Sequence, residues 1–98
     1  MNNTVWVLTC GIESSREMKP LREDMMDLAV TEKHANEMYD IHKQALKNRL
    51  TTTWNKNKVC QRFSLDEYLN EKEETTERER IYFCGMYRLI LRKYKEVL

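Results

Sequence analysis

The sequence contains little glycine and proline and no long apolar run. Two glycines and one proline in 98 residues are too few for an all-β fold built on many tight turns. Gly11 and Gly85 stand alone, so neither a phosphate-binding loop nor a dinucleotide fingerprint is present. The apolar run Val5 to Leu8 is far shorter than the roughly 20 residues that span a bilayer. We therefore expect no transmembrane helix and no membrane partner.

The cysteine content and the start of the chain bear on the cellular compartment. Cys10, Cys60 and Cys84 are odd in number and far apart in sequence, a pattern that suits reduced thiols better than a disulfide framework. No Lys or Arg precedes the first apolar run and no small-residue cleavage site follows it, so a secretory signal is not expected. We therefore expect a cytoplasmic protein.

Charge is balanced in total but unevenly distributed along the chain. The chain has 17 basic and 16 acidic residues, a net charge of +1. Residues 1–40 carry eight acids and four bases, 41–65 six bases and no acid, 66–79 seven acids and two bases, and 80–98 five bases and one acid. Such blocks either pair with one another inside the fold or present separate charged faces to a partner.

The first half of the chain predicts two strands and a long helix. Residues 4–10 are rich in β-branched and aromatic side chains, which predicts a strand buried on both faces. Residues 13–24 predict a loop, and 25–30 a second strand, with a short helix over 20–28 as the alternative. Thr31 suits an N-cap, and apolar residues then recur at helical spacing over 32–50: Ala35, Met38, Tyr39, His42, Ala45, Leu46 and Leu50.

The second half of the chain predicts a loop, a short strand, a short helix and a C-terminal segment that is either a helix or a hairpin. Residues 51–58 lack a helical period and predict a basic loop, followed by a short strand over 59–63. Ser64 and Glu67 have the spacing of a capping box, which predicts a helix through Lys72. Thr76 and Glu79 repeat that spacing and favour a C-terminal helix. The alternative for 80–92 is a hairpin around Gly85 and Met86.

Together these elements predict a single α+β domain over residues 1–98. A small antiparallel sheet packs against a long central helix and a C-terminal helix, as suits a chain at the lower end of domain size. The apolar seam of that last helix is also able to pair with a second copy of the chain, so a homodimer remains open; its residues are Phe83, Met86, Ile90, Tyr94 and Val97.

No residue pattern predicts a catalytic, metal or cofactor site. His34 and His42 on one helix would lie roughly 12 Å apart along its axis, too far to share a metal ion. No cysteine pair has metal-ligand spacing, and nothing in the sequence orients Cys10 toward a histidine as a nucleophile pair would require. We therefore expect a binding protein rather than an enzyme, with no cofactor.

Two charged stretches are candidate binding surfaces. The first is an acidic face for a protein partner, consisting of Asp66, Glu67, Glu71, Glu73 and Glu74. The second is a basic segment with an aromatic residue, able to hold phosphates while a base stacks on the indole, and consists of Lys47, Arg49, Trp54, Lys56 and Lys58. The first predicts a protein-interaction module, and the second predicts nucleic-acid or nucleotide binding.

Two segments in the first 45 residues resemble short accessory proteins of phages and mobile elements. These are Val5-Trp6-Val7-Leu8-Thr9, a V-x-V-x-T strand, and Leu28-Ala29-Val30-Thr31-Glu32-Lys33-His34-Ala35, a strand followed by a T-x-x-x-A helix. The resemblance implies a small non-enzymatic protein that binds and blocks a host protein or complex, a class that includes anti-CRISPR and other anti-defence inhibitors. It assigns no role to individual residues, and the C-terminal half is not covered by it.

Overall fold

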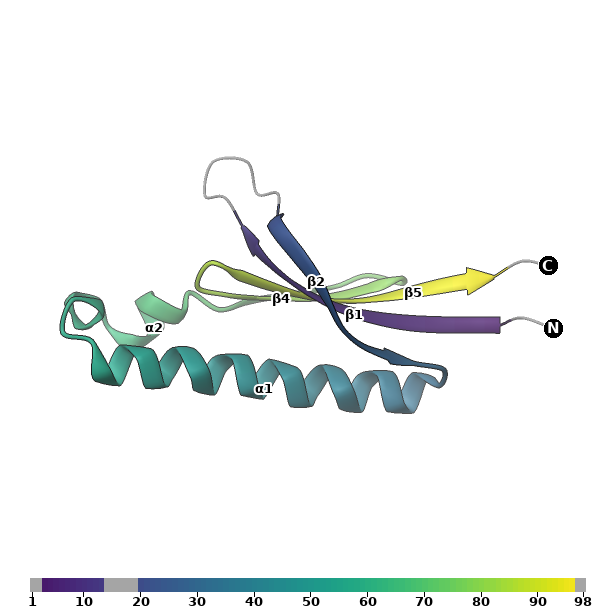
Figure 1. The fold of residues 1–98 in the computed structure, drawn as a ribbon, viewed down its shortest axis with the longest axis horizontal. Helices are drawn as coiled ribbons and strands as arrows, with labels where there is room; N and C mark the ends of the chain where they lie inside the picture. Colours follow the sequence, from purple (N-terminus) through teal and green to yellow (C-terminus); the bar gives the residue numbers. More distant parts are fainter. Residues whose placement is uncertain (1–2, 14–19, 97–98) are drawn as a thin grey trace.

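A five-stranded antiparallel sheet lies on one long helix, and the α+β class predicted from the sequence is confirmed (Figure 1). The computed structural model describes residues 3–13 and 20–96. The strands are β1 (Asn3–Glu13), β2 (Pro20–Ala29), β3 (Lys72–Thr75), β4 (Glu79–Cys84) and β5 (Tyr87–Glu96), in the sheet order β2-β1-β5-β4-β3. Because β1 pairs with β5, strands from the two ends of the chain lie at the centre of the sheet.

The long helix α1 (Glu32–Lys56) begins where the sequence predicts and ends later. The Thr31 hydroxyl accepts a hydrogen bond of 3.2 Å from the backbone N–H of His34, which caps the first turn. The predicted loop over 51–58 is wrong, because the helix continues to Lys56. Three consecutive threonines lie in this last part, and their hydroxyls donate to the backbone carbonyls four residues earlier. A threonine hydroxyl inside a helix commonly finds its acceptor in this way.

A short irregular segment follows α1. The predicted strand over 59–63 is wrong, since Cys60–Arg62 form a 3-10 turn, η1. The capping box at Ser64 is confirmed, with both of its hydrogen bonds to Glu67 present. It opens the helix α2 (Leu65–Leu69), which stops before the predicted Lys72 because Asn70 takes a left-handed conformation with φ of 43°.

The C-terminal helix predicted from Thr76 onward is wrong, and the hairpin alternative is correct. Strands β4 and β5 pair around a two-residue loop, Gly85-Met86. Gly85 has φ of +60° and Met86 has no positive φ, as in a type II′ turn. The spacing of Thr76 and Glu79 serves the β3–β4 turn instead of a helix, because the Thr76 hydroxyl accepts from the Glu79 backbone N–H.

The N-terminal hairpin is longer than predicted. Strand β1 continues to Glu13 and β2 begins at Pro20, so every described residue of the predicted loop over 13–24 is strand. The helical alternative for 20–28 is wrong, and the second strand over 25–30 is confirmed up to Ala29. Residues 14–19 of the predicted loop lie outside the described residues.

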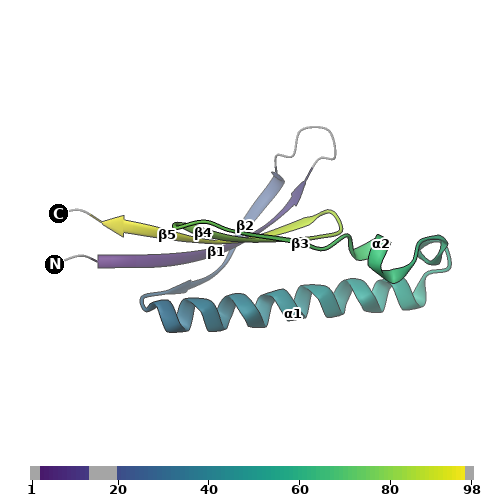
Figure 2. The same cartoon turned by 180° about the vertical axis from the view of Figure 1, so that it is seen from behind.

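Helix α1 covers one face of the sheet and leaves the other face open. Figures 1 and 2 show from opposite sides that α1 runs along one side of the sheet, with α2 at the end of the sheet beside the C-terminal part of α1. The side chains between the two layers form one apolar core, consisting mainly of Leu8, Ala35, Met38, Tyr39, Leu46, Leu69, Tyr82, Cys84, Leu89 and Leu91. No described helix is both long and apolar enough to cross a membrane.

Candidate functional site

Two of the five acids in the predicted acidic face are held by α1. Glu71 and Glu73 lie next to and within β3, and their carboxylates reach the lysines of the helix. Lys43 Nζ lies 2.8 Å from Glu73 Oε2, and Lys47 Nζ lies 3.4 Å from Glu71 Oε2. The basic block over 41–65 and the acidic block over 66–79 thus neutralise each other in part across the two layers.

Buried tyrosines complete this contact between the layers. The hydroxyl of Tyr39 donates to Glu73 at 2.9 Å, and that of Tyr82 donates to Glu71 at 2.6 Å. Burial raises the pKa of both phenols, and the hydrogen bonds to carboxylates raise it further. The phenols therefore stay protonated as donors, and the arrangement stabilises the fold rather than supplying an acid or base near neutral pH.

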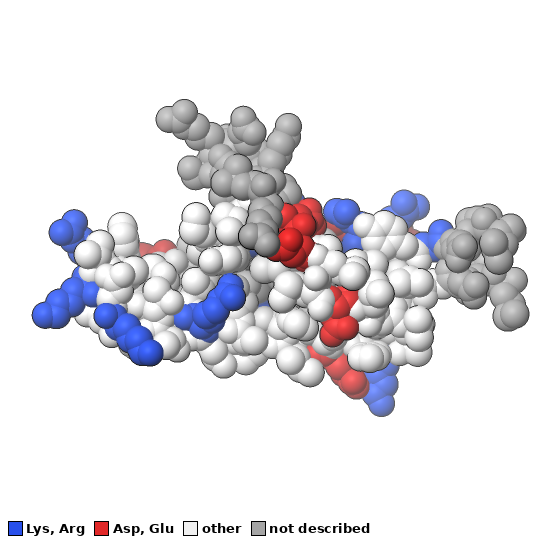
Figure 3. Space-filling view, in the orientation of Figure 1, with Lys and Arg blue, Asp and Glu red and all other residues white. Residues whose placement is uncertain are grey.

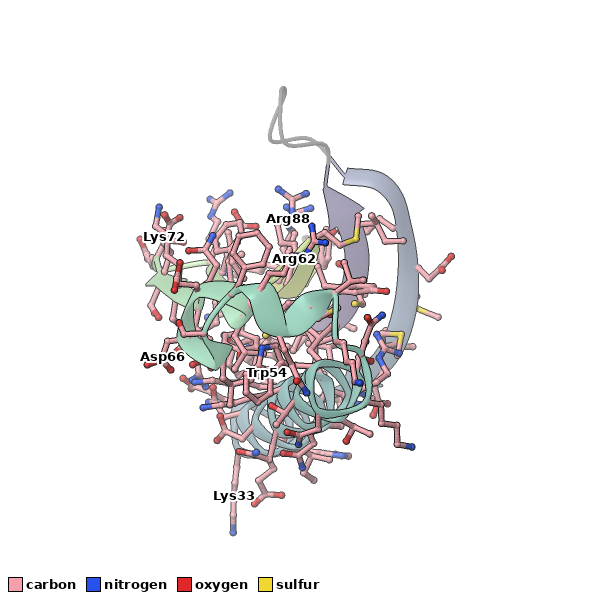
Figure 4. All side chains as sticks on the ribbon, turned by 90° about the vertical axis from the view of Figure 1, so that its left-hand side faces the viewer. Lys33, Trp54, Arg62, Asp66, Lys72 and Arg88 are labelled. Atoms are coloured by element: carbon pink, nitrogen blue, oxygen red, sulfur yellow. The ribbon has the colours of Figure 1, made fainter. Side chains whose placement is uncertain are left out.

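The other three acids point in different directions. Glu67 accepts the backbone hydrogen bond of the capping box, and Glu74 Oε1 lies 2.9 Å from Lys72 Nζ. Asp66 is exposed on α2 and points away from the sheet (Figure 4). The structure therefore does not bring Asp66, Glu67, Glu71, Glu73 and Glu74 together as one unpaired acidic surface.

The five residues of the predicted nucleic-acid site are also separated by their contacts. Lys47 is paired with Glu71, and the Arg49 guanidinium stacks on the Tyr87 ring at 5.1 Å. The indole N–H of Trp54 donates to the Phe63 carbonyl at 3.0 Å, and Figure 4 shows this side chain between α1 and the segment that carries Arg62 and Asp66. Of the predicted set, Lys56 and Lys58 remain as exposed cations near the end of α1.

The face of the sheet opposite α1 carries an apolar patch. The sequence predicted two charged binding surfaces but not this one. Strand alternation and the pairing register place its side chains on the face opposite the core. Ile90 is only 2% exposed although it lies outside the core cluster, because side chains of the same face surround it. The patch, which we call the open-face patch, consists of Val5, Val7, Met25, Leu28, Ile81, Phe83, Ile90 and Tyr94.

A signal for this patch is present in the sequence. The strand over 4–10 was predicted to be buried on both faces because its apolar residues do not alternate with polar ones. An antiparallel sheet with one solvated face normally alternates apolar and polar residues. In the structure α1 covers only one of the two apolar faces of the sheet. The second apolar face of β1 therefore has no layer of the same chain packed over it.

Strand β2 joins the open-face patch to an exposed edge. It is the outermost strand on its side of the sheet, and Met25 and Leu28 are 63% and 48% exposed. A bulge lies between its pairings with Leu8 and Thr9, which turns Met26 and Asp27 toward the α1 side. In Figure 3 acidic side chains form a band over β2 and α1, while basic side chains gather at the left end, where α1 ends.

The nucleophilic and metal-ligating side chains are dispersed. Burial raises the pKa of the Cys10 and Cys84 thiols, which disfavours the reactive thiolate. His42 Nε2 lies 3.6 Å from Asp27 Oδ2, a contact between α1 and β2. In the described ranges, no group of three or more His, Cys, Asp or Glu residues is arranged to hold a metal ion.

Comparison with known proteins gives no relative. No family model matches the chain, and neither the curated proteins nor the solved structures contain a significant match.

Proposed function

We propose that this protein is a non-enzymatic protein-binding module whose contact surface is the open-face patch. The observation that carries the proposal is the mismatch between apolar side chains and their cover, because α1 covers one face of the sheet and β1 is apolar on both. Strands β4 and β5 add Ile81, Phe83, Ile90 and Tyr94 to the open face, beside the ion pair of Arg92 and Glu79. Apolar patches that a monomer leaves exposed commonly mark sites of protein association. A partner layer on this face would bury what the fold leaves in water.

The chemistry of the partner follows from the edge of the patch. Apolar side chains at the centre supply the affinity, since their burial is favourable by roughly 25 cal/mol per Å². Glu23 of β2 lies at the edge of this face, where its carboxylate accepts a hydrogen bond from the Thr9 hydroxyl. An acidic residue at this edge favours a partner with basic residues around an apolar centre. This role replaces the acidic face over 66–74, whose carboxylates are largely engaged within the fold.

The most specific form of the proposal is an inhibitor of the phage or mobile-element type. In that form the partner is a host defence or nucleic-acid-handling complex, as the sequence resemblance implies, and binding blocks its working surface. The alternative function, nucleic-acid binding, depends on Lys56 and Lys58, which are exposed. The pull-down described next distinguishes the two functions.

The experiment is a pull-down from host lysate, run with and without nuclease and at two salt concentrations, with matched variants. Met25→Gln with Leu28→Gln removes exposed apolar surface from the patch without changing the charge. Ile41→Gln with Val59→Gln is the control, because these residues are similarly exposed, at 67% and 63%, but lie on α1 and beside η1.

We expect one defined protein to be retained by the wild type and the control and lost by the patch variant, with all three chains folded by circular dichroism. Equal retention by the patch variant would refute the open-face surface. Recovery that disappears with nuclease treatment or moderate salt would instead support nucleic-acid binding.

A further inference from the structure

A cavity of about 350 Å³ lies between α1 and the sheet, on the side opposite the open-face patch. In Figure 1 the hairpin of β1 and β2 rises away from the C-terminal half of α1, and the cavity occupies the space that this divergence leaves. Its volume is within the range of small-molecule sites in proteins. Because its walls lie on the α1 side of the sheet, a protein bound to the open-face patch would leave it accessible.

The walls of the cavity are mainly apolar. Ile12 and Met26 come from the hairpin, Ala45 and Leu46 from α1, and Leu89 from β5. The side chain of Met26 is 49% exposed. Such walls favour an aliphatic or aromatic body, whose burial removes apolar surface on both sides from water.

One cation at this cavity has no acidic partner among the described residues. Lys43 and Lys47 of α1 are paired with the β3 edge, and His42 contacts Asp27. Arg49 also lines the cavity, and its described contact is the stack on the Tyr87 ring, 5.1 Å from the guanidinium carbon to the ring centroid. This stack holds the guanidinium at the cavity while leaving its N–H donors for a ligand.

The remaining polar groups at the cavity are weaker candidates for recognition. Asp24 on the β2 side already takes part in a contact of its own. Cys10 is half-buried in the wall, and a thiol is only a weak hydrogen-bond donor. Arg49 is therefore the group that selects the ligand, and a planar guanidinium prefers a carboxylate or a similar oxyanion.

We propose that this cavity binds a small amphipathic anion, with its apolar body against Ile12, Leu46 and Leu89 and its carboxylate on Arg49. The site is independent of the proposed protein-binding surface, because none of its walls belongs to the open-face patch.

The test is calorimetric titration of the purified full-length chain with octanoate, 1-octanol and octylammonium. Arg49→Met removes the charge and keeps the apolar stem, and Lys56→Met is the matched control on the same helix. Ala45→Phe fills the cavity from an exposed helix position, so its effect does not depend on altering the core.

We expect octanoate to bind the wild type and Lys56→Met alike, and to bind Arg49→Met about tenfold more weakly, as the loss of a charge-assisted hydrogen bond implies. Octanol should bind both chains equally, octylammonium more weakly than octanoate, and Ala45→Phe should abolish octanoate binding. No octanoate binding at millimolar concentration, equal binding by Arg49→Met and the control, or undiminished binding by Ala45→Phe would each overturn the proposal.

Discussion

The hydroxyl of Tyr39 donates a 2.9 Å hydrogen bond to the carboxylate of Glu73. Tyr39 is fully buried in α1, and Glu73 lies on β3, the edge strand farthest from the N-terminal hairpin. Lys43 reaches the other oxygen of the same carboxylate at 2.8 Å. This one acidic residue therefore fastens the short edge strand to the helix, although the sequence suggested that it serves a partner.

Replacing Tyr39 with Phe tests this role. The change deletes the buried donor and keeps the ring, and it should lower the free energy of unfolding by about 1 to 2 kcal/mol. Tyr94→Phe is the control, because Tyr94 is 49% exposed on the sheet and its loss should cost less than about 0.5 kcal/mol. Urea denaturation followed by circular dichroism measures both, and equal losses would contradict an interlayer role for the Tyr39 hydroxyl.

Acid should weaken the fold through Glu71 and Glu73. Hydrogen bonds from Tyr82 to Glu71 and from Lys43 to Glu73 hold the pKa of each carboxyl below its ordinary value of 4.5. A lowered folded-state pKa contributes stability above the unfolded value, and that contribution is lost as pH falls through the folded pKa. The melting temperature should therefore decline from about pH 5 downward.

The variant Glu73→Gln isolates this effect. It should be less stable than the wild type at pH 7 and should lose less stability on acidification, because one of the two titrating groups is gone. Glu74→Gln removes the acidic residue of the exposed ion pair with Lys72. It should leave the decline of melting temperature at low pH almost unchanged. A pH series of thermal melts measures this. If the melting temperatures of the wild type and Glu73→Gln fell equally with falling pH, Glu73 would not contribute to the acid destabilisation.

Gly85 is required by its backbone conformation rather than by lack of space. An added Cβ would lie 3.5 Å from Leu50 Cδ1, an ordinary contact, but φ is +60°. Gly85→Ala should therefore destabilise the β4–β5 hairpin by about 1 to 2 kcal/mol, and Gly85→Asn by less, since Asn tolerates positive φ better. Denaturation curves compare the two, and a neutral Gly85→Ala would show that the turn adopts another geometry.

Trp54 anchors the turn after α1 through its hydrogen bond to the Phe63 carbonyl. Trp54→Phe keeps an aromatic ring but removes the donor, and it should cost about 1 kcal/mol. Amide hydrogen exchange should become faster over residues 60–63 and stay unchanged in β1 and β5. Unaltered exchange in that turn would indicate that the indole is free, as the nucleic-acid alternative requires.

Local sequence signals located several elements correctly. Thr31 and Ser64 offered side-chain acceptors to helix N-termini, and these short-range bonds form as predicted. The apolar run over 4–10 determined a strand, and the helical spacing after Thr31 determined α1, because each depends on a periodicity that a few neighbouring residues define. The same run over 4–10 also held the signal for a second apolar face, which is the basis of the proposed binding surface.

Long-range contacts decided the rest. Near-helical spacing of Phe83, Ile90 and Tyr94 fits a helix as well as strands, and only pairing of β5 with β1 settles the strand form; Val97 of the same seam lies outside the described residues. The threonines at the end of α1 follow the helix because Leu50 is buried and Trp54 is anchored.

The candidate sites depended on tertiary structure even more than the fold did. Whether a lysine or a glutamate is free depends on which residue faces it across the layers, and sequence separation does not encode that distance. Folding brings Lys43 to Glu73 and Lys47 to Glu71. Residues of the basic and the acidic stretch therefore pair with each other inside the fold. Folding leaves the open-face patch and the cavity at Arg49, which exist only because one helix covers one face of a twisted sheet and diverges from its hairpin.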